Sequence, residues 1–145
     1  MIATETATIR PARLEDLPEV TACIIALRQE TLWKDVPFTP NPVYILGWLL
    51  EALMNPVHQL FIAEADGEII GACGGELLTP RFIPDVLYVQ EWLWYVKPAH
   101  RENFVKIQLL LRLYRWAKQQ GAKGGVAGRL TPHGEELRWT PFYSV

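Results

Sequence analysis

The sequence predicts a mixed α/β fold in which helices flank a sheet with antiparallel strands at its centre. The stretch "HQLFIAEADGEIIGACGGE" (58–76) has two β-prone runs on either side of Asp66-Gly67, a pair that takes the positive φ angles of a tight hairpin turn. A long aromatic and β-branched stretch, "PDVLYVQEWLWYVKP" (84–98), then precedes an amphipathic helix. The predicted element order is β-α-α-β-β-β-α-β-α-β.

The first third of the chain predicts one strand and two helices. The stretch "ATIRPA" (7–12) is a short strand that ends at Pro11. Residues 14–30 form a helix with Asp16 as its N-cap, because apolar residues recur three and four positions apart on one face: Leu17, Val20, Ile24 and Leu27. After a proline-rich loop, Asn41-Pro42 opens a second helix that stops at Asn55-Pro56.

The second half contains the remaining elements. The glycines at 71, 74 and 75 predict a bulge or bend in the second hairpin arm. The long helix runs from about Asn103 to Gln120, and its apolar side is predicted to hold Ile107, Leu111, Tyr114 and Ala117. After Gly121, "KGGVAG" is predicted as a short buried strand, "TPHGEELRW" as a short helix and "FYSV" as a final strand.

Composition narrows the class of protein. The 145 residues fit one domain, without repeats, low-complexity tracts or linkers. A net charge of −2 with no cationic block argues against a nucleic-acid or anionic-membrane surface. The start, "MIATETATIR", lacks a basic and apolar leader, and the longest apolar stretch, "VYILGWLLEALM", is too short to span a bilayer. We therefore expect a cytoplasmic protein.

The cysteines and histidines show no metal-site spacing. Cys23 and Cys73 lie far apart, so we expect two reduced structural thiols. His58, His100 and His133 form no ligand set with one another or with the cysteines, and no bound metal is expected.

The element order and three stretches resemble the GNAT acyltransferase superfamily. These stretches are "IRPARLEDLPEV", "IAEADGEIIGACGG" and "EWLWYVKPAHR", and the resemblance covers most of the chain, with a compressed C-terminus. In that family a strand ending in Val-x-Pro leads into Arg/Gln-x-x-Gly-x-Gly/Ala and a helix. Val96, Pro98 and Arg101 match this pattern, whereas Phe104 and Lys106 stand in place of the two small residues.

The resemblance implies acetyl-CoA as co-substrate. Its pyrophosphate would lie on the N–H groups at the helix start. A backbone N–H of Trp94 or Tyr95 would polarise the thioester carbonyl, and Val96 would contact the pantetheine arm. The cofactor-binding residues implied are Trp94, Tyr95, Val96, Arg101, Asn103 and Lys106.

The loop without glycines allows two interpretations. It could bind the cofactor in a wider form that depends on the charges of Arg101 and Lys106. Alternatively, Phe104 could be a core residue of the helix start and Lys106 a solvated side chain, in which case cofactor binding is lost.

Glu91 is the candidate general base, since it is the only acid on the long central strand and its aromatic neighbours could raise its pKa. A shift of one residue in register would turn Gln90 instead of Glu91 toward the cleft in which the reaction takes place, and a strand bulge could return Glu91 to that cleft. A solvated strand glutamate is the alternative.

By resemblance, the acid for the leaving thiolate is a tyrosine near the C-terminus. The family position falls on Leu137, and Tyr143 is the substitute, with an edge-strand tyrosine as the alternative.

The resemblance predicts an N-acetyltransferase that acts on a primary amine of a small molecule or a protein. Trp33 and Phe38, in the loop that overhangs the acceptor side in this family, are predicted to shape the acceptor pocket or to staple the loop. The alternative function is a GNAT fold that has lost its cofactor and binds a protein partner or a second copy through its many aromatic residues.

Overall fold

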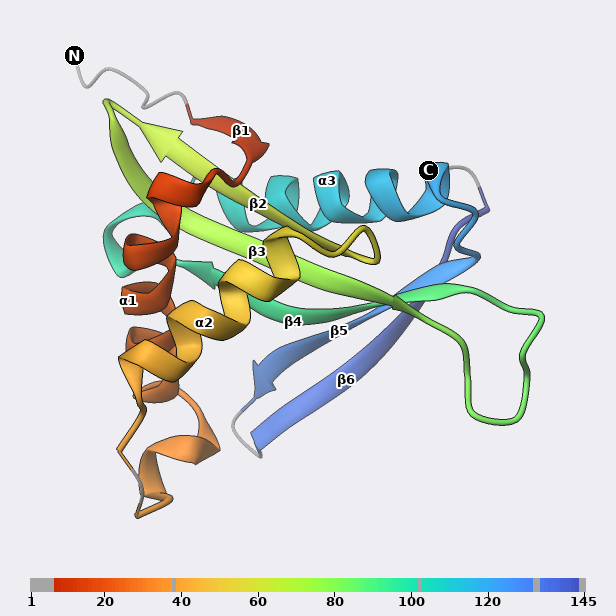
Figure 1. Cartoon of the computed structure of the whole chain (residues 1–145), viewed down its shortest axis with the longest axis horizontal. Coiled ribbons are helices and arrows are strands. Elements are labelled where there is room, and N and C mark those ends of the chain that lie inside the picture. Colours follow the sequence, from red (N-terminus) through yellow and green to blue (C-terminus); the bar gives the residue numbers. More distant parts are fainter. Residues whose placement is uncertain (1–6, 38, 102, 132–133, 144–145) are drawn as a thin grey trace.

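In the computed structural model, which describes residues 7–37, 39–101, 103–131 and 134–143, one six-stranded sheet has its strands in chain order (Figure 1). The strands are β1 (Thr8–Pro11), β2 (His58–Ala65), β3 (Glu68–Leu78), β4 (Tyr88–Val96), β5 (Gly124–Thr131) and β6 (Gly134–Pro141). Neighbouring strands are antiparallel except β4 and β5, which are parallel. The predicted mixed α/β class is confirmed.

The helices lie on both faces of the sheet. Helices α1 (Leu17–Arg28) and α2 (Pro42–Leu53) cover one face, and α3 (Val105–Gln119) covers the other (Figure 1). Each face has its own apolar core: Leu17, Leu49 and Ile62 belong to the α1/α2 side, and Phe61, Leu109 and Leu113 to the α3 side. Among the described residues, no helix is long and apolar enough to cross a membrane.

Local signals in the sequence explain how several elements begin and turn. The Asn41 side chain accepts hydrogen bonds from the N–H groups of Val43 (3.0 Å) and Tyr44 (3.2 Å), which confirms it as the N-cap of α2. Asp66 (φ 52°) and Gly67 (φ 76°) form the predicted tight turn between β2 and β3.

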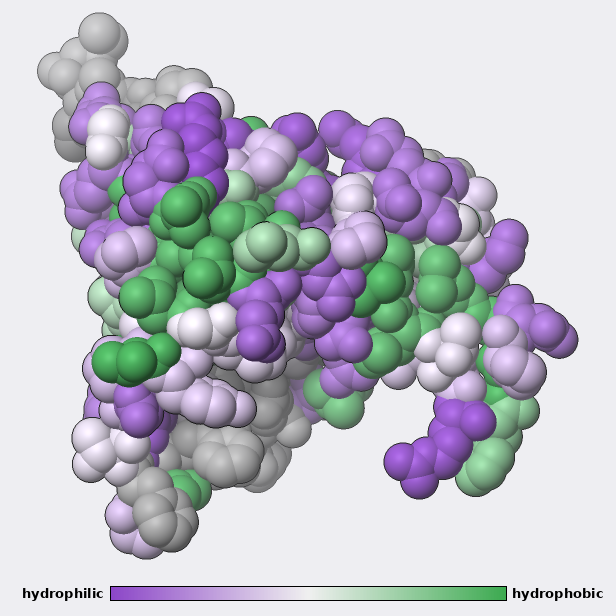
Figure 2. Space-filling view, viewed as in Figure 1, coloured by the Kyte–Doolittle hydropathy of each residue, from purple (hydrophilic) through white to green (hydrophobic). Residues whose placement is uncertain are grey.

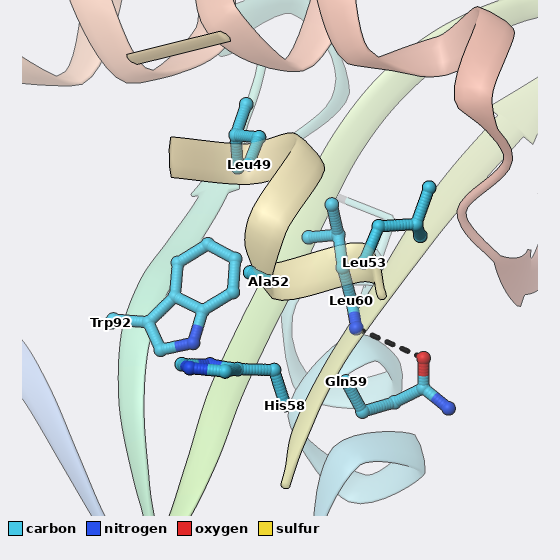
Figure 3. Close-up of a pocket in the computed structure, with 7 residues that line it drawn as sticks. All are labelled: Leu49, Ala52, Leu53, His58, Gln59, Leu60 and Trp92. Carbon is cyan, nitrogen blue, oxygen red and sulfur yellow. Dashed lines mark hydrogen bonds between the residues drawn. The ribbon is translucent and has the colours of Figure 1, made fainter. Parts of the chain in front are cut away.

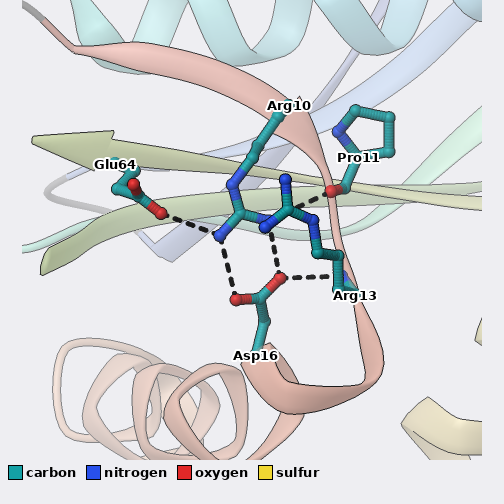
Figure 4. A network of polar contacts seen from close by, with 5 residues as sticks. All are labelled: Arg10, Pro11, Arg13, Asp16 and Glu64. Atoms are coloured by element: carbon teal, nitrogen blue, oxygen red, sulfur yellow. Dashed lines mark hydrogen bonds and ion pairs between the residues drawn. The ribbon is translucent and has the colours of Figure 1, made fainter. Parts of the chain in front are cut away.

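Asp16 acts through a partly buried ion network rather than through a cap bond to the helix that follows it. Its carboxylate accepts hydrogen bonds from the Arg10 guanidinium at 2.8 and 3.1 Å and from the Arg13 backbone N–H at 2.7 Å (Figure 4). Arg10 also pairs with Glu64 at 2.8 Å. The network therefore ties β1, β2 and the start of α1 together.

Two bulges interrupt the ladders on either side of β3. Between β2 and β3 the register shifts after Ala63, and Ile70 is the extra residue on β3, as its glycine content predicted. Between β3 and β4, Gly74 lies opposite Leu93 and Gly75 opposite Glu91, so Trp92 is the extra residue on β4. Consequently both Trp92 and Leu93 face α1 and α2.

Three details of the prediction are wrong. The stretch expected to be a short helix, 131–139, lies largely in β6, which forms a hairpin with β5 from Gly124↔Pro141 to Thr131↔Gly134. Phe142 and Tyr143 form no strand. On α3, Tyr114 and Ala117 are buried as predicted, but Ile107 and Leu111 are exposed, because Val105, Leu109 and Leu113 complete the buried stripe instead.

Candidate active site

The site begins where β4 and β5 separate. These parallel strands pair only at Val89↔Gly125 and Gln90↔Val126. Beyond these two residue pairs, a side chain and not the backbone of β4 bonds to β5: the Glu91 carboxylate accepts a hydrogen bond from the Gly128 N–H at 3.2 Å. The backbone edge of β4 beyond Gln90 is therefore available to a ligand that lies between the strands.

A cavity of about 300 Å³ lies on the α3 side of this opening. It is lined by Trp94 from β4, by Leu110 and Tyr114 from α3, and by residues of the β5–β6 hairpin: Ala127, Arg138 and Thr140. Its size is that of a pocket for part of an extended small molecule.

The start of α3 forms the end of the site beyond the C-terminal end of β4. Its first intrahelical hydrogen bond runs from the Gln108 N–H to the Phe104 carbonyl, so the preceding N–H groups have no acceptor within the helix. Phe104 is in the left-handed conformation (φ 57°), and its side chain is 73% exposed. The interpretation of Phe104 as a core residue is therefore wrong, and its backbone takes a conformation that favours glycine.

Lys106 is partly buried rather than solvated. Its ammonium lies 4.8 Å from the centre of the Trp94 ring, while the Trp94 indole N–H donates to the Lys106 carbonyl at 2.7 Å. Burial and the nearby charge of Arg101 lower the pKa of Lys106. The pair fixes the start of α3 to β4 beside the cavity.

Arg101 turns toward α1. Its Nε donates to the Val96 carbonyl at 2.8 Å, its Nη2 pairs with Glu30 at 2.7 Å, and the guanidinium lies over the Tyr95 ring at 5.4 Å. The ion pair lowers the pKa of Glu30. Arg101 thus closes the turn after β4, while Asn103 lies half-buried in the bend before α3.

The two predicted catalytic groups are far from each other in the fold. Glu91 lies opposite Gly75 and shares its α3-facing side, and its carboxylate spans the gap to β5. Because Trp92 is an extra residue on β4, Glu91 lies on the same face as Trp94 and Val96, as the predicted bulge allows. Tyr143 is 89% exposed and follows Phe142, whose N–H bonds to Lys123 at the start of β5. The structure does not bring Tyr143 to Glu91.

Tyr114 is a candidate that the sequence did not reveal. It lines the cavity close to Thr140, and burial raises its pKa to about 12, so it stays protonated at neutral pH. Its ring lies against Gly125 of β5. No local signal marks it, since only the fold brings this helical tyrosine beneath the point where the strands separate.

A second, smaller cavity of about 20 Å³ lies under α2, on the opposite face of the sheet (Figure 3). His58 and Trp92 point into it, and Trp48 packs edge-on against both rings. Within the described residues, His58 Nδ1 and Trp92 Nε1 have no hydrogen-bond partner. The space suits one water molecule, not a substrate.

Comparison with known families shows the family to which the chain belongs. The model of the acetyltransferase (GNAT) family matches residues 24–129, about three quarters of the chain. The chain belongs to the GNAT acetyltransferase family. A search of curated protein sequences found no significant match.

Solved structures of other proteins share the fold. An N-acetyltransferase of Staphylococcus aureus Mu50 is 24% identical, with a TM-score of 0.70 over 85% of this chain and 73% of that one. AAC(6')-Iy, solved with a CoA bisubstrate analog, is 21% identical, with a TM-score of 0.69 over 97% and 98%. A Clostridium acetobutylicum protein, described as a predicted acetyltransferase and solved with acetyl-CoA, is 20% identical, with a TM-score of 0.68 over 89% and 84%.

The remaining predictions concern the acceptor loop, the cysteines and a metal site. Phe38 and His133 lie outside the described residues, as does the side chain of Trp33. Cys23 and Cys73 are free and buried, as expected, and burial raises the pKa of Cys23 to about 11. In the described part of the chain, no three His, Cys, Asp or Glu residues are grouped to hold a metal ion.

Proposed function

We propose that this GNAT protein is an N-acetyltransferase that moves the acetyl group of acetyl-CoA to a primary amine of a small molecule or a protein. The observation that carries the proposal is the continuity of the site, in which the start of α3, Trp94 and the cavity lie along the opening between β4 and β5. Two structurally similar proteins were solved with acetyl-CoA or a CoA bisubstrate analog, which supports this cofactor.

In this proposal the start of α3 binds the pyrophosphate. The N–H groups of the first turn, which have no acceptor within the helix, and the helix dipole attract the anion, and the Lys106 ammonium adds a full charge next to them. Phe104 supplies the left-handed turn with its ring directed to solvent, so the turn forms without the family glycine. Arg101 and Asn103 complete the loop.

The pantetheine arm would lie along the edge of β4 that β5 leaves open, where the Val96 carbonyl already accepts from Arg101, and the N–H of Trp94 or Tyr95 would polarise the thioester carbonyl. The amine nitrogen attacks this carbonyl, the bond to sulfur breaks, and the coenzyme A thiolate leaves. Glu91 accepts the amine proton directly or through water. The thiolate takes a proton from a nearby acid, for which Tyr114 is better placed than Tyr143.

Calorimetric titration with acetyl-CoA tests the cofactor site. We expect micromolar binding by the wild type and a loss of at least tenfold in Lys106→Glu, because the substitution puts a negative charge beside the pyrophosphate. Arg101→Glu should abolish acetyl-CoA binding. It adds a negative charge to the loop, and it removes the bonds from Arg101 to the Val96 carbonyl and to Glu30 that hold the turn. Arg115→Glu, exposed at the far end of α3, is the matched control and should bind normally.

A second function is a GNAT fold that has lost its cofactor and serves as a protein-binding module. Two observations favour it: Phe104 occupies a glycine position, and Arg101 is engaged by Glu30. Absence of binding at millimolar acetyl-CoA, with the protein folded, would select this function over the transferase.

A further inference from the structure

Helix α2 is apolar on the side that faces solvent as well as on the side that faces the core. Leu49 and Ala52 are buried against the sheet. On the opposite side Val43 is 79% exposed, Leu50 41% and Met54 78%. Figure 2 shows hydrophobic surface gathered over α2, the helix to which these exposed residues belong. A helix that is apolar all round is ordinarily covered on both sides.

The exposed residues follow a coiled-coil pattern. Val43, Gly47, Leu50 and Met54 succeed one another at intervals of four, three and four, so they form one straight seam along the helix. The only charged residue of α2, Glu51, lies beside this seam and not in it. A seam with this spacing and no charge fits another helix rather than a polar ligand.

Gly47 gives the seam a recess. Glycine weakens a helix interior, and a Cβ placed on Gly47 would meet nothing within 4 Å, so packing inside this chain does not require it. Leu50, one turn further on, projects from the same seam. The seam therefore holds a hole and a knob side by side.

We propose that this seam binds a second copy of the chain, with the two α2 helices antiparallel about a two-fold axis. In that arrangement position 47 of each copy lies opposite position 50 of the other, and position 43 lies opposite position 54. Each Leu50 fills the recess at the other copy's Gly47, and each Val43 packs on a Met54. The same patch thus complements itself, which is the requirement for a closed two-fold dimer.

The available surface is adequate for such a dimer. The exposed apolar residues on and beside the seam are Val43, Tyr44, Leu46, Leu50, Met54 and Val57. Together they expose roughly several hundred Å² per copy, which is the size of the larger apolar patches on proteins and a large part of the roughly 800 Å² per partner of a standard interface.

Light scattering coupled to gel filtration, over a range of protein concentrations, tests the dimer. We expect the mass of two chains for the wild type, and a dissociation constant raised roughly a hundredfold or more in Leu50→Glu, which buries a carboxylate against Gly47 of the second copy. Leu111→Glu is the matched control: Leu111 is 48% exposed on α3 and should leave the dimer intact. Far-UV circular dichroism checks that each variant is folded.

A charge exchange tests the antiparallel arrangement. Val43→Lys and Met54→Glu should each weaken self-association, and their equimolar mixture should recover a heterodimer, since the ammonium introduced in one chain then faces the carboxylate introduced in the other. A wild type that stays monomeric at every concentration overturns the proposal. So does loss of the dimer in Leu111→Glu but not in Leu50→Glu, or failure of the folded mixture to associate.

Discussion

Phe104 shows how one residue can keep a local geometry that its own side chain opposes. It adopts the left-handed backbone with its ring exposed, so the ring gains no packing energy that offsets the strain. The strain of a non-glycine residue in this region is about 1–2 kcal/mol. Against this, glycine makes the unfolded chain more flexible, which lowers the free energy of unfolding by about 0.4–1 kcal/mol.

We therefore predict that Phe104→Gly raises the free energy of unfolding by about 0.5–1 kcal/mol, because relief of strain exceeds the entropic cost. Urea denaturation measures the change. Phe82→Gly is the control, since Phe82 is 89% exposed and has no positive φ, and it should not stabilise the protein. Equal or lower stability of Phe104→Gly would contradict the strain argument.

Asp16 is the residue whose ionisation should matter most for acid stability. Its hydrogen bonds from Arg10 lower its pKa below the ordinary value of 3.8. A carboxyl with a lowered folded-state pKa stabilises the protein above its unfolded pKa, and this contribution is lost as the pH falls through the folded value.

We predict that Asp16→Asn costs roughly 3 kcal/mol at neutral pH, because Arg10 keeps a partly buried charge with one partner fewer. The variant should also lose less stability than the wild type between pH 5 and about pH 2. Urea denaturation across this pH range tests both statements. Asp85→Asn, in an exposed loop, is the control, and an Asp16→Asn profile parallel to that of the wild type would refute the assignment.

At the scale of elements, the sequence predicted what local chemistry determines. Asn41 caps α2, Asp66-Gly67 makes the hairpin turn, and the apolar spacing defines α1. It failed where tertiary partners decide. The stretch "GEELRW" has helix-favouring glutamates but is a strand because β5 pairs with it.

In the site, too, the sequence did not predict contacts between residues that are distant along the chain. The dense leucines of α3 permitted two apolar faces, and only packing on the sheet selected the observed one. Arg101 was predicted for phosphate, yet its ion-pair partner Glu30 follows α1, and Tyr114 reaches the cavity only because α3 crosses beneath β5. The partners of these side chains were therefore not predictable from the loop sequence.

The contact between α3 and β5 offers a test at this scale. A Cβ on Gly125 would lie 2.4 Å from the buried ring of Tyr114, so one of the two elements must move. We predict that Gly125→Ala destabilises the fold by about 1–3 kcal/mol. The cost should shrink in a Tyr114→Leu background, as a double-mutant cycle in urea would show; an unchanged cost would mean that another contact limits the site.

At the scale of the whole molecule, the sheet separates two surfaces. The cavity beside Trp94 and Tyr114 lies on the α3 face, whereas the proposed dimer seam lies on α2 across the sheet. Dimer formation would thus leave the cofactor site open. We expect Leu50→Glu, whatever its oligomeric state, to bind acetyl-CoA as the wild type does in the same titration, and a loss of binding would show that the two surfaces are coupled.

Glu91 lies where the sheet opens, and its charge and its hydrogen bond to Gly128 can be tested separately. Glu91→Gln keeps an oxygen that accepts from the Gly128 N–H but cannot take a proton from an amine. We predict unchanged stability and acetyl-CoA affinity with a turnover number lower by about 10²–10⁴, the usual contribution of a general base. Glu91→Ala should in addition lose about 1–3 kcal/mol of stability, because the Gly128 N–H loses its acceptor.

The measurement is steady-state acetylation of an amine identified by screening, followed through release of the coenzyme A thiol. Glu76→Gln, on the neighbouring strand β3, is the matched control and should retain turnover. If Glu91→Gln turns over at the wild-type rate while Glu91→Ala is destabilised, then Glu91 holds the two strands together at the opening and the amine loses its proton to solvent. In that case catalysis rests on the polarised thioester and the positioned cofactor alone.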